Sequence, residues 1–357
     1  MNKIIYSYKG SLLKGLGRYF LDERRKAFCF SFSASGFEVR FFGTEVKARI
    51  LANNIGQEMG QPYFGVVLDD MKFSEAKIFK PDKEEDSYTL VSGLERKEHL
   101  LRLYKLTESH CDWLGFKEIE TDGRFLPVND EKKLFIEAYG DSITCGDGID
   151  GIEGDDHFET RTENALHTYT ALLSEKLDAD FSLISVGGAV VEYKSPFNVN
   201  SPIRTTPPLF NFAYYDDNTC SNNAILWDNT NNRHPDYVLI NLGTNDNHYL
   251  TDLEGNERAT EEVNFKKAYS LFINLILTTY PQTKIIMLTG MIEAPIVEKL
   301  IKEVSETINY PQVYFLKLNS LSVGGYRADN GHPNRKMHEE ASEELFRFIA
   351  NIGQKNA

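Results

Sequence analysis

The hydrophobic pattern of this chain changes near residue 130, and one kind of sheet cannot accommodate both patterns. Before that point, short runs at residues 28–33, 37–41 and 46–51 alternate apolar and polar residues. Such alternation is typical of strands with one buried face, and turn residues such as Gly43 separate the runs. We therefore expect residues 1–130 to form a domain built as an antiparallel β-sandwich.

After residue 131, apolar runs alternate with helical patterns. Continuous apolar runs predict buried strands at residues 134–139, 181–185, 237–241, 285–288 and 313–316. Apolar residues at helical spacing predict helices at residues 162–177, 261–280, 296–308 and 337–351. Buried strands that alternate with helices indicate a parallel sheet covered on both faces, so we expect a second domain, of the α/β class, at residues 131–357.

The charge balance narrows the possible partners. The chain has 53 Asp and Glu against 39 Lys and Arg, a net charge of −14, which disfavours nucleic acid and anionic membranes as partners. No segment approaches the roughly 20 apolar residues of a membrane span. The first residues lack the apolar core of a signal peptide, so we expect a cytoplasmic protein, or a secreted one if a leader was removed. The scattered cysteines predict neither a zinc site nor a disulfide framework; they are Cys29, Cys111, Cys145 and Cys220.

Four polar motifs follow the predicted strands, at the edge of the sheet where α/β proteins bind ligands. They are Gly140-Asp141-Ser142, Gly187-Gly188, Gly243-Thr244-Asn245-Asp246 and Asp329-Asn330-Gly331-His332. Taken singly, each has a structural explanation: a tight turn, a helix cap or a structural histidine. Together, in this order and at these places, they indicate a catalytic site.

The four motifs resemble the blocks of the SGNH hydrolases, the Gly-Asp-Ser-(Leu) esterase superfamily. Residues 140–146, 162–165 and 235–246 are further similar to carbohydrate esterase family two, and residues 36–44 and 105–108 resemble its sandwich. The resemblance implies a flavodoxin-like three-layer α/β/α domain preceded by a jelly-roll sandwich. The Pro- and Asn-rich stretch at residues 192–233 departs from the family pattern and leaves the substrate preference open.

By this resemblance, Ser142 is the nucleophile, His332 is the general base and Asp329 orients His332. The resemblance also implies an oxyanion hole made by the backbone N–H groups of Ser142 and Gly188 and the side-chain amide of Asn245. These roles agree with the chemistry of ester hydrolysis. A serine hydroxyl needs an adjacent base to become a nucleophile, and the tetrahedral intermediate needs donors already aimed at its oxyanion.

Two further expectations concern the glycine motif and the aspartates next to the site. Gly188 aligns better than Gly187 with the second glycine of the family block, and the choice of donor between them stays open. Asp141 and Asp246 are expected to stay ionised and to hydrogen-bond the loops that carry the nucleophile and the amide donor.

Aromatic residues between the second and third strands suggest a saccharide substrate. Tyr214, Tyr215 and Trp227 lie in this stretch, and aromatic faces suit the apolar face of a sugar ring, although the rings can equally pack the loop against the body. Trp227, Tyr215 and Gly187 are the candidate substrate-binding residues. The resemblance implies an O-acetyl group on a xylo- or manno-oligosaccharide as substrate.

Two other functions compete with deacetylation. One is an O-acyltransferase that uses the same serine and passes the acyl group to a sugar hydroxyl. The other is a carbohydrate-binding protein without catalysis, which the intact set of motifs disfavours. No cofactor and no metal is expected, because no phosphate-binding loop is present and His338-Glu339 lacks the second histidine of a zinc protease. The oligomeric state has no signature in the sequence.

Overall fold

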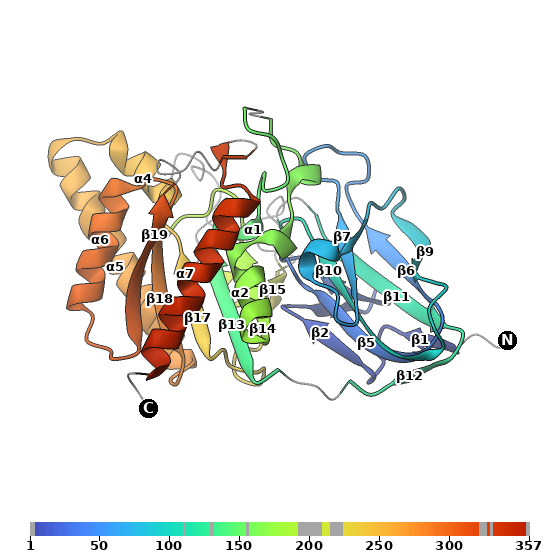
Figure 1. Cartoon of the computed structure of the whole chain (residues 1–357). Helices are drawn as coiled ribbons and strands as arrows, with labels where there is room; N and C mark the ends of the chain where they lie inside the picture. Colours follow the sequence, from blue (N-terminus) through green and yellow to red (C-terminus); the bar gives the residue numbers. More distant parts are fainter. Residues whose placement is uncertain are drawn as a thin grey trace.

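The computed structural model describes residues 4–109, 112–128, 132–154, 157–191, 209–214, 224–320, 327–328 and 331–354. A part rich in antiparallel strands and a part with a parallel sheet and helices lie side by side (Figure 1). Among the described residues, no helix combines the length and the apolar character that crossing a membrane would require.

The amino-terminal part is a sandwich of two antiparallel sheets, as predicted. One sheet has the order β3 (Phe20–Asp22), β4 (Ala27–Phe30), β11 (Leu114–Thr121), β6 (Val46–Ala52) and β9 (Glu85–Val91), with β1 (Ile4–Ser7) paired to β11. The other has the order β12 (Arg124–Leu126), β5 (Gly36–Gly43), β10 (Lys97–Lys105), β7 (Phe64–Leu68) and β8 (Lys77–Phe79), with β2 (Leu13–Leu16) paired to β5. Apolar side chains from both sheets fill the space between them, and the rings of Phe37 and Phe116 lie 4.5 Å apart there.

The carboxyl-terminal part is built on a five-stranded parallel sheet. Its order is β14 (Ala179–Ser185), β13 (Leu134–Gly140), β17 (Tyr237–Asn241), β18 (Lys284–Met291) and β19 (Val313–Ser320). This is the flavodoxin-like order, in which the second strand lies outside the first and the others follow on the opposite side. A small hairpin of β15 (Phe212–Tyr214) and β16 (Ile225–Leu226) lies outside this sheet.

Helices cover both faces of the parallel sheet. The α2 (Tyr169–Leu177) and α7 (Arg335–Gln354) helices bury their apolar residues in one core, and α5 (Gly255–Thr279) and α6 (Pro295–Thr307) bury theirs in the other. Two shorter helices, α1 (Ser142–Cys145) and α4 (Thr244–Thr251), begin just after β13 and β17. The three-layer arrangement predicted from the sequence is therefore confirmed.

One predicted helix begins later than expected. Residues 162–177 were expected to form a single helix, but the 3-10 turns η2 (Thr160–Thr162) and η3 (Ala165–His167) precede α2. The side chain of Asn164 accepts a hydrogen bond from the Leu166 N–H at 3.2 Å, and Thr168 accepts one from the Ala171 N–H at 3.4 Å. Each of these side chains starts a new element, so apolar spacing alone placed the helix start too early.

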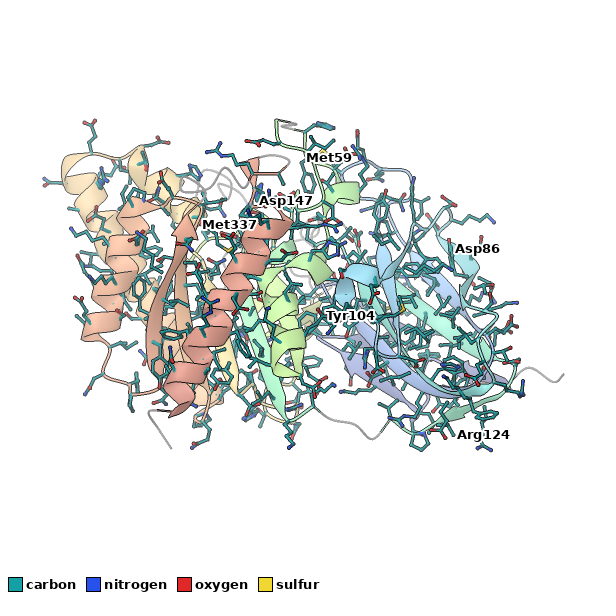
Figure 2. All side chains as sticks on the ribbon, viewed as in Figure 1. Met59, Asp86, Tyr104, Arg124, Asp147 and Met337 are labelled. Carbon is teal, nitrogen blue, oxygen red and sulfur yellow. The ribbon has the colours of Figure 1, made fainter. Side chains whose placement is uncertain are left out.

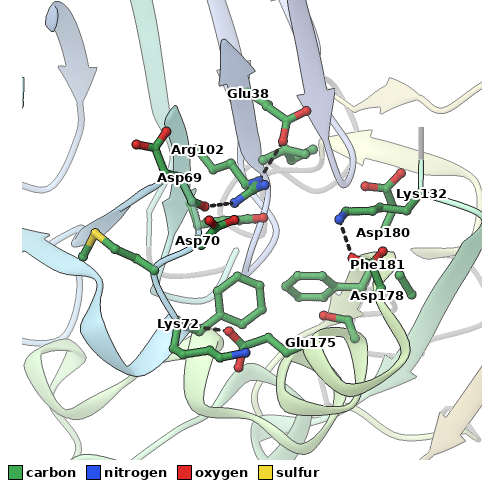
Figure 3. A pocket seen from close by; sticks show the side chains of 16 residues that line it. Glu38, Asp69, Asp70, Lys72, Arg102, Lys132, Glu175, Asp178, Asp180 and Phe181 are labelled. Carbon is green, nitrogen blue, oxygen red and sulfur yellow. Dashed lines mark hydrogen bonds and ion pairs between the residues drawn. The ribbon is translucent and has the colours of Figure 1, made fainter. Parts of the chain in front are cut away.

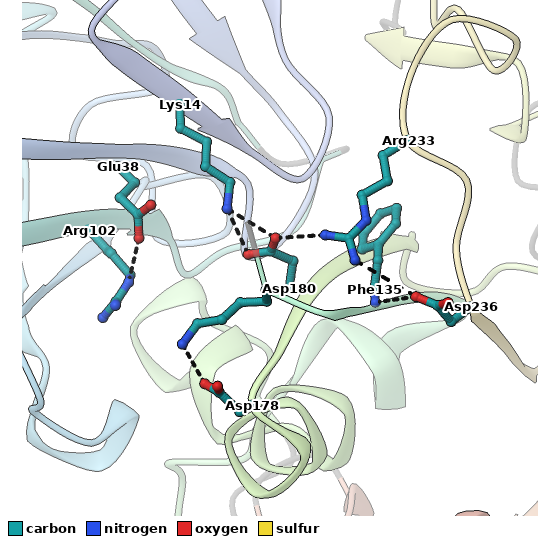
Figure 4. A network of polar contacts seen from close by, with 9 residues as sticks. Lys14, Glu38, Arg102, Phe135, Asp178, Asp180, Arg233 and Asp236 are labelled. Atoms are coloured by element: carbon teal, nitrogen blue, oxygen red, sulfur yellow. Dashed lines mark hydrogen bonds and ion pairs between the residues drawn. The ribbon is translucent and has the colours of Figure 1, made fainter. Parts of the chain in front are cut away.

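The two parts share one interface with an apolar centre. Phe73 in η1 (Phe73–Glu75) and Tyr104 in β10 pack on Phe181 in β14, with ring centroids 5.7 and 6.0 Å apart. Near the start of the parallel strands, Asp180 forms ion pairs with Lys14 at 3.0 Å and Arg233 at 3.1 Å (Figure 4).

A buried arginine ties the sandwich to the parallel-sheet part. Arg18 is fully buried and donates to the carbonyl oxygens of Phe210 at 2.8 Å and Phe212 at 2.9 Å. Its other terminal nitrogen lies 3.3 Å from a carboxylate oxygen of Glu137 in β13 and 3.1 Å from the Tyr139 hydroxyl. The two parts are thus held together by buried polar bonds as well as by apolar packing.

Candidate active site

The sheet topology brings the four polar motifs to one edge. Ser142 begins α1 directly after β13, Gly187 and Gly188 follow β14, and Asn245 lies in the first turn of α4 after β17. Because parallel strands all end at the same edge, these loops lie together although up to about a hundred residues separate them. His332 lies just before α7, at the same edge.

Ser142 and His332 are in direct contact. The Ser142 Oγ and the His332 Nε2 atoms are 2.8 Å apart, which is a hydrogen-bond distance between a hydroxyl and an imidazole. The backbone N–H of Ala328 donates to the carbonyl oxygen of His332 at 2.8 Å and closes the loop before α7. Asp329, the residue expected to orient the imidazole, lies outside the described residues.

Asn245 joins two of the other motifs. Its side-chain nitrogen donates to the carbonyl oxygen of Ala189 at 3.0 Å and lies 3.5 Å from a carboxylate oxygen of Asp141. The first contact uses one amide hydrogen, and the second is too long to hold the other strongly. Gly243 sets the direction of this helix start, since its φ is +119° and a Cβ there would lie 2.3 Å from Val297 Cγ1.

The glycine motif forms a tight turn with its amides in different environments. The Ala189 N–H donates to the Val186 carbonyl oxygen at 3.1 Å, and Gly188 has a φ of +71°. The Gly187 N–H donates to a carboxylate oxygen of Glu108, a residue of the sandwich. For the Gly188 N–H no acceptor is found within the described part of the chain, so of the two glycines it is Gly188 that has an amide hydrogen to offer a ligand.

Asp141 bonds the loop of the candidate nucleophile as expected, whereas Asp246 bonds the segment after the glycine turn, and burial acts against the expected charge of Asp141. Asp141 accepts the Ile143 N–H at 3.1 Å, and Asp246 accepts the Val191 N–H at 3.0 Å. Burial raises the pKa of Asp141 to about 7, although the amide hydrogen bond and the nearby imidazole of His332 act in the opposite direction. At neutral pH this carboxyl group is therefore only partly ionised.

Two acidic residues that the sequence reasoning did not single out lie on the loop after α1. Asp147, which is labelled in Figure 2, is buried. One of its carboxylate oxygens is 3.5 Å from the His332 Nε2 atom. Asp150 accepts hydrogen bonds from His167 at 2.8 Å and from Arg335, at the start of α7, at 2.6 Å. This loop therefore anchors the segment that carries His332. An acidic Asp-Gly-Ile-Asp sequence, which follows the Gly-Asp-Ser motif after four residues, was the available signal.

The aromatic candidates pack against the sandwich in the described residues. The Trp227 ring meets Tyr19 edge to face with centroids 5.7 Å apart, and Tyr214 lies 5.1 Å from Phe20. These contacts favour the packing explanation for both rings, and contact of Trp227 with a substrate stays a prediction. Tyr215 lies outside the described residues.

A cavity of about 240 Å³ lies at the opposite edge of the sheet (Figure 3). Ala179, Asp180 and Phe181, which line it, are the first residues of β14, so the cavity is at the amino ends of the parallel strands. Neither Ser142 nor His332 lines it. Two of its acidic residues form ion pairs, Glu38 with Arg102 and Asp178 with Lys132. Its lining residues include no nucleophile paired with a base.

Comparison with protein families divides the chain into the same two parts. Residues 16–128 match the model of the carbohydrate esterase 2 N-terminal domain, and residues 138–340 match that of the GDSL-like lipase/acylhydrolase family. Among curated proteins, the cellulase/esterase CelE of Acetivibrio thermocellus is 25% identical over 343 residues, which are 94% of this chain and 39% of CelE. The acetylxylan esterase/glucomannan deacetylase of Cellvibrio japonicus is 25% identical over 307 residues, which are 85% of this chain and 78% of that protein.

Solved structures share the fold over nearly the whole chain. A family two carbohydrate esterase from Cellvibrio japonicus has a TM-score of 0.83 at 21% identity and covers 98% of both chains. A family two carbohydrate esterase from Clostridium thermocellum, solved in complex with cellohexaose, has a TM-score of 0.80 at 23% identity and covers 95% of this chain and 98% of the other. The paired architecture of sandwich and parallel sheet is therefore common to these proteins.

Proposed function

This chain belongs to the GDSL-like lipase/acylhydrolase family and carries the amino-terminal domain of carbohydrate esterase 2, and on that premise we propose that it is a serine esterase that removes O-acetyl groups from saccharides. The observation that carries the proposal is the 2.8 Å contact between Ser142 Oγ and His332 Nε2, two residues 190 positions apart in the chain. A serine hydroxyl needs such an adjacent base to act as a nucleophile at neutral pH.

In the proposed first step, Ser142 Oγ attacks the carbonyl carbon of the acetyl group and its proton passes to His332 Nε2. The tetrahedral intermediate collapses, the sugar oxygen leaves with the proton from His332, and an acetyl ester remains on Ser142. A water molecule then attacks that ester while His332 takes one of its protons. The second tetrahedral intermediate collapses, His332 returns the proton to Ser142 Oγ, and acetic acid departs and ionises to acetate in the solvent.

Three donors are proposed to bind the oxyanion. The backbone N–H groups of Ser142 and Gly188 support this role, because neither has an acceptor within the described part of the chain. The side chain of Asn245 supports it through the hydrogen that is held only by the long contact to Asp141. Donors aimed at a developing negative charge are often the largest single contribution to this kind of catalysis.

We further propose that Asp329 orients the imidazole of His332, and that the two domains meet at residues 130–131. The order Asp-x-x-His supports the first assignment, as does the closed loop formed by the Ala328–His332 backbone bond. The end of β12 at Leu126 and the start of β13 at Leu134 support the second.

Acetylated xylo- or manno-oligosaccharides are the proposed substrates. The names of the relatives support this class, since one is an acetylxylan esterase and glucomannan deacetylase. The chain spans 39% of the length of CelE, whose other activities are not carried over to it. The cytoplasmic location expected from the sequence stays a prediction, and finding the native protein in the culture medium would contradict it.

The test is acetate release from a panel of acetylated xylo- and manno-oligosaccharides. Ser142→Ala and His332→Gln should each lower kcat by at least about 10³-fold, because the nucleophile and its base act as a unit. His99→Gln is the control, since it removes an imidazole that pairs with Asp69 at 2.8 Å in the sandwich, and this variant should leave kcat unchanged. A Ser142→Ala enzyme with normal rates would refute the mechanism.

The same assay separates the two alternatives. An acyltransferase would form acetylated acceptor when an unacetylated oligosaccharide is added, at the expense of free acetate. A non-catalytic binding protein would release no acetate from any member of the panel while still binding the sugars.

A further inference from the structure

A buried glutamate from the sandwich reaches the glycine turn beside the candidate nucleophile. Glu108 follows β10 and is only 1% exposed. Its carboxylate accepts the Gly187 N–H, and the same oxygen lies 3.6 Å from the sulfur of Cys145, at the end of α1. One side chain of the amino-terminal part thus contacts both the glycine turn and the helix that begins at Ser142.

The contact depends on residue 187 being a glycine. A Cβ at this position would lie 2.8 and 2.9 Å from the two carboxylate oxygens of Glu108, closer than real Cβ contacts come. The carboxylate therefore packs directly on the backbone. Because Glu108 is buried in the interface, its side chain has little room to move away from a larger residue.

We propose that Glu108 is a positioning residue for the esterase reaction, holding the Gly187 amide so that the next amide, that of Gly188, faces the oxyanion formed at Ser142. This inference rests on the proposed function. Peptide units are planar, so a bond to the Gly187 N–H fixes one plane of the turn. The Ala189 N–H bond to the Val186 carbonyl oxygen closes the turn on its far side, and the Gly188 N–H lies between these two restraints.

The surroundings of Glu108 hold its backbone in place. Its own backbone N–H donates to Glu163 at 3.1 Å, and Lys105 Nζ donates to its carbonyl oxygen at 3.0 Å. Burial, together with the negative charges of Glu108 and Asp147, raises the pKa of Glu163 well above its usual value. This direction favours the protonated form of Glu163, which weakens its repulsion of the neighbouring carboxylate of Glu108.

The inference is tested with three substitutions at residue 108. Glu108→Met removes the acceptor at similar size, Glu108→Asp keeps the charge but shortens the reach, and Glu108→Gln keeps an acceptor oxygen at the same distance. Loss of a whole oxyanion donor costs about 10²- to 10³-fold in kcat. A donor that is present but poorly held should cost less, so we expect kcat to fall about 10- to 50-fold for Met and Asp and less than about 5-fold for Gln, with KM nearly constant.

A second measurement separates positioning from a general structural role. An alkylboronic acid forms a tetrahedral anion on the serine, so its Ki reports how well the oxyanion is bound. We expect Ki to rise in Glu108→Met and Glu108→Asp by the same factor as kcat/KM falls, and to recover in Glu108→Gln. The control is Glu38→Met, which removes a buried carboxylate paired with Arg102 at 2.7 Å in the sandwich and should leave kcat and Ki unchanged.

The outcomes are distinguishable. If Glu108→Met and Glu108→Asp keep kcat and the boronate Ki within threefold of wild type while Ser142→Ala is inactive, the inference is wrong and the proposed function stands. If kcat falls but Ki does not change, Glu108 has only a structural role and the inference is equally wrong. If Ser142→Ala retains full activity, the proposed function itself fails. Should the Met variant not fold, the Asp and Gln variants decide in the same way.

Discussion

Replacing Asp141 by asparagine should change how the stability of this protein depends on pH. Asp141 precedes Ser142, is 1% exposed and caps α1 through the Ile143 N–H. Burial raises its pKa from a usual value of 3.8 to about 7. An asparagine at this position keeps an oxygen that accepts the same amide hydrogen, but it carries no ionisable proton.

The sign and size of this change in the free energy of unfolding follow from the pKa values of Asp141 in the unfolded and the folded chain. In the unfolded chain Asp141 ionises near pH 3.8, and in the folded chain near pH 7, so the folded state binds more protons between these values. The stability that this group contributes is complete below pH 3.8 and is lost as the pH rises through about 7. The difference of about 3.2 pKa units corresponds, at 1.36 kcal/mol each, to about 4 kcal/mol as an upper limit. Asp141→Asn should therefore gain up to about 4 kcal/mol over wild type at pH 8 and little at pH 4.

The free energy of unfolding of both proteins, measured in urea from about pH 2 to pH 9, tests this. Asp150→Asn is the control, because its effect on the free energy of unfolding should have the opposite sign. Burial alone would raise the pKa of Asp150, but hydrogen bonds from His167 and Arg335 outweigh it and lower the pKa to about 2. That variant should lose stability at pH 7, and the loss should shrink as the pH falls towards 2. A difference between Asp141→Asn and wild type that is the same at pH 5 and pH 9 would refute the reasoning.

Three further substitutions test single contacts. Asn245→Ala should lower kcat about 10²- to 10³-fold with little change in KM, because it removes a proposed oxyanion donor; initial rates of acetate release that show only a higher KM would contradict this. Arg18→Met should lower the free energy of unfolding by about 3–5 kcal/mol, because it leaves the buried Glu137 carboxylate without its cationic partner, and urea unfolding that changes by less than about 1 kcal/mol would exclude this account. Gly243→Ala should cost at least about 2 kcal/mol and also reduce kcat, since the φ of +119° and the contact with Val297 force the start of α4 to move; a variant of normal stability and rate would be the contrary result.

The convergence of Ser142 and His332 could be predicted because it depends on topology. Alternating strands and helices determine a parallel sheet, and the carboxyl ends of its strands lie at one edge. Short polar motifs placed after the strands must then lie near one another, whatever their separation in the chain. The structure agrees, with the two side chains 2.8 Å apart. The catalytic roles assigned to them stay predictions until the variants are measured.

Contacts between the two parts could not be predicted in this way. Glu108 contacts Gly187, 79 residues away in the sequence, and Arg18 contacts Phe210, 192 residues away. No local sequence pattern predicts either contact. A glutamate or an arginine in a sequence is normally a surface residue, and its burial follows only from the packing of two sheets on each other. The late start of α2, in contrast, could have been predicted, because the capping residues Asn164 and Thr168 are visible in the sequence.

The distribution of polar bonds along the interface explains why the sandwich belongs to the candidate site. Apolar packing between Phe73, Tyr104 and Phe181 has no strong directional preference and would allow the two parts to rotate on each other. Buried hydrogen bonds from Arg18 and Glu108 do have direction, and each must keep its geometry or leave a buried polar group unsatisfied. Since Glu108 bonds the glycine turn itself, the orientation of the sandwich and the orientation of the turn are set by the same contact.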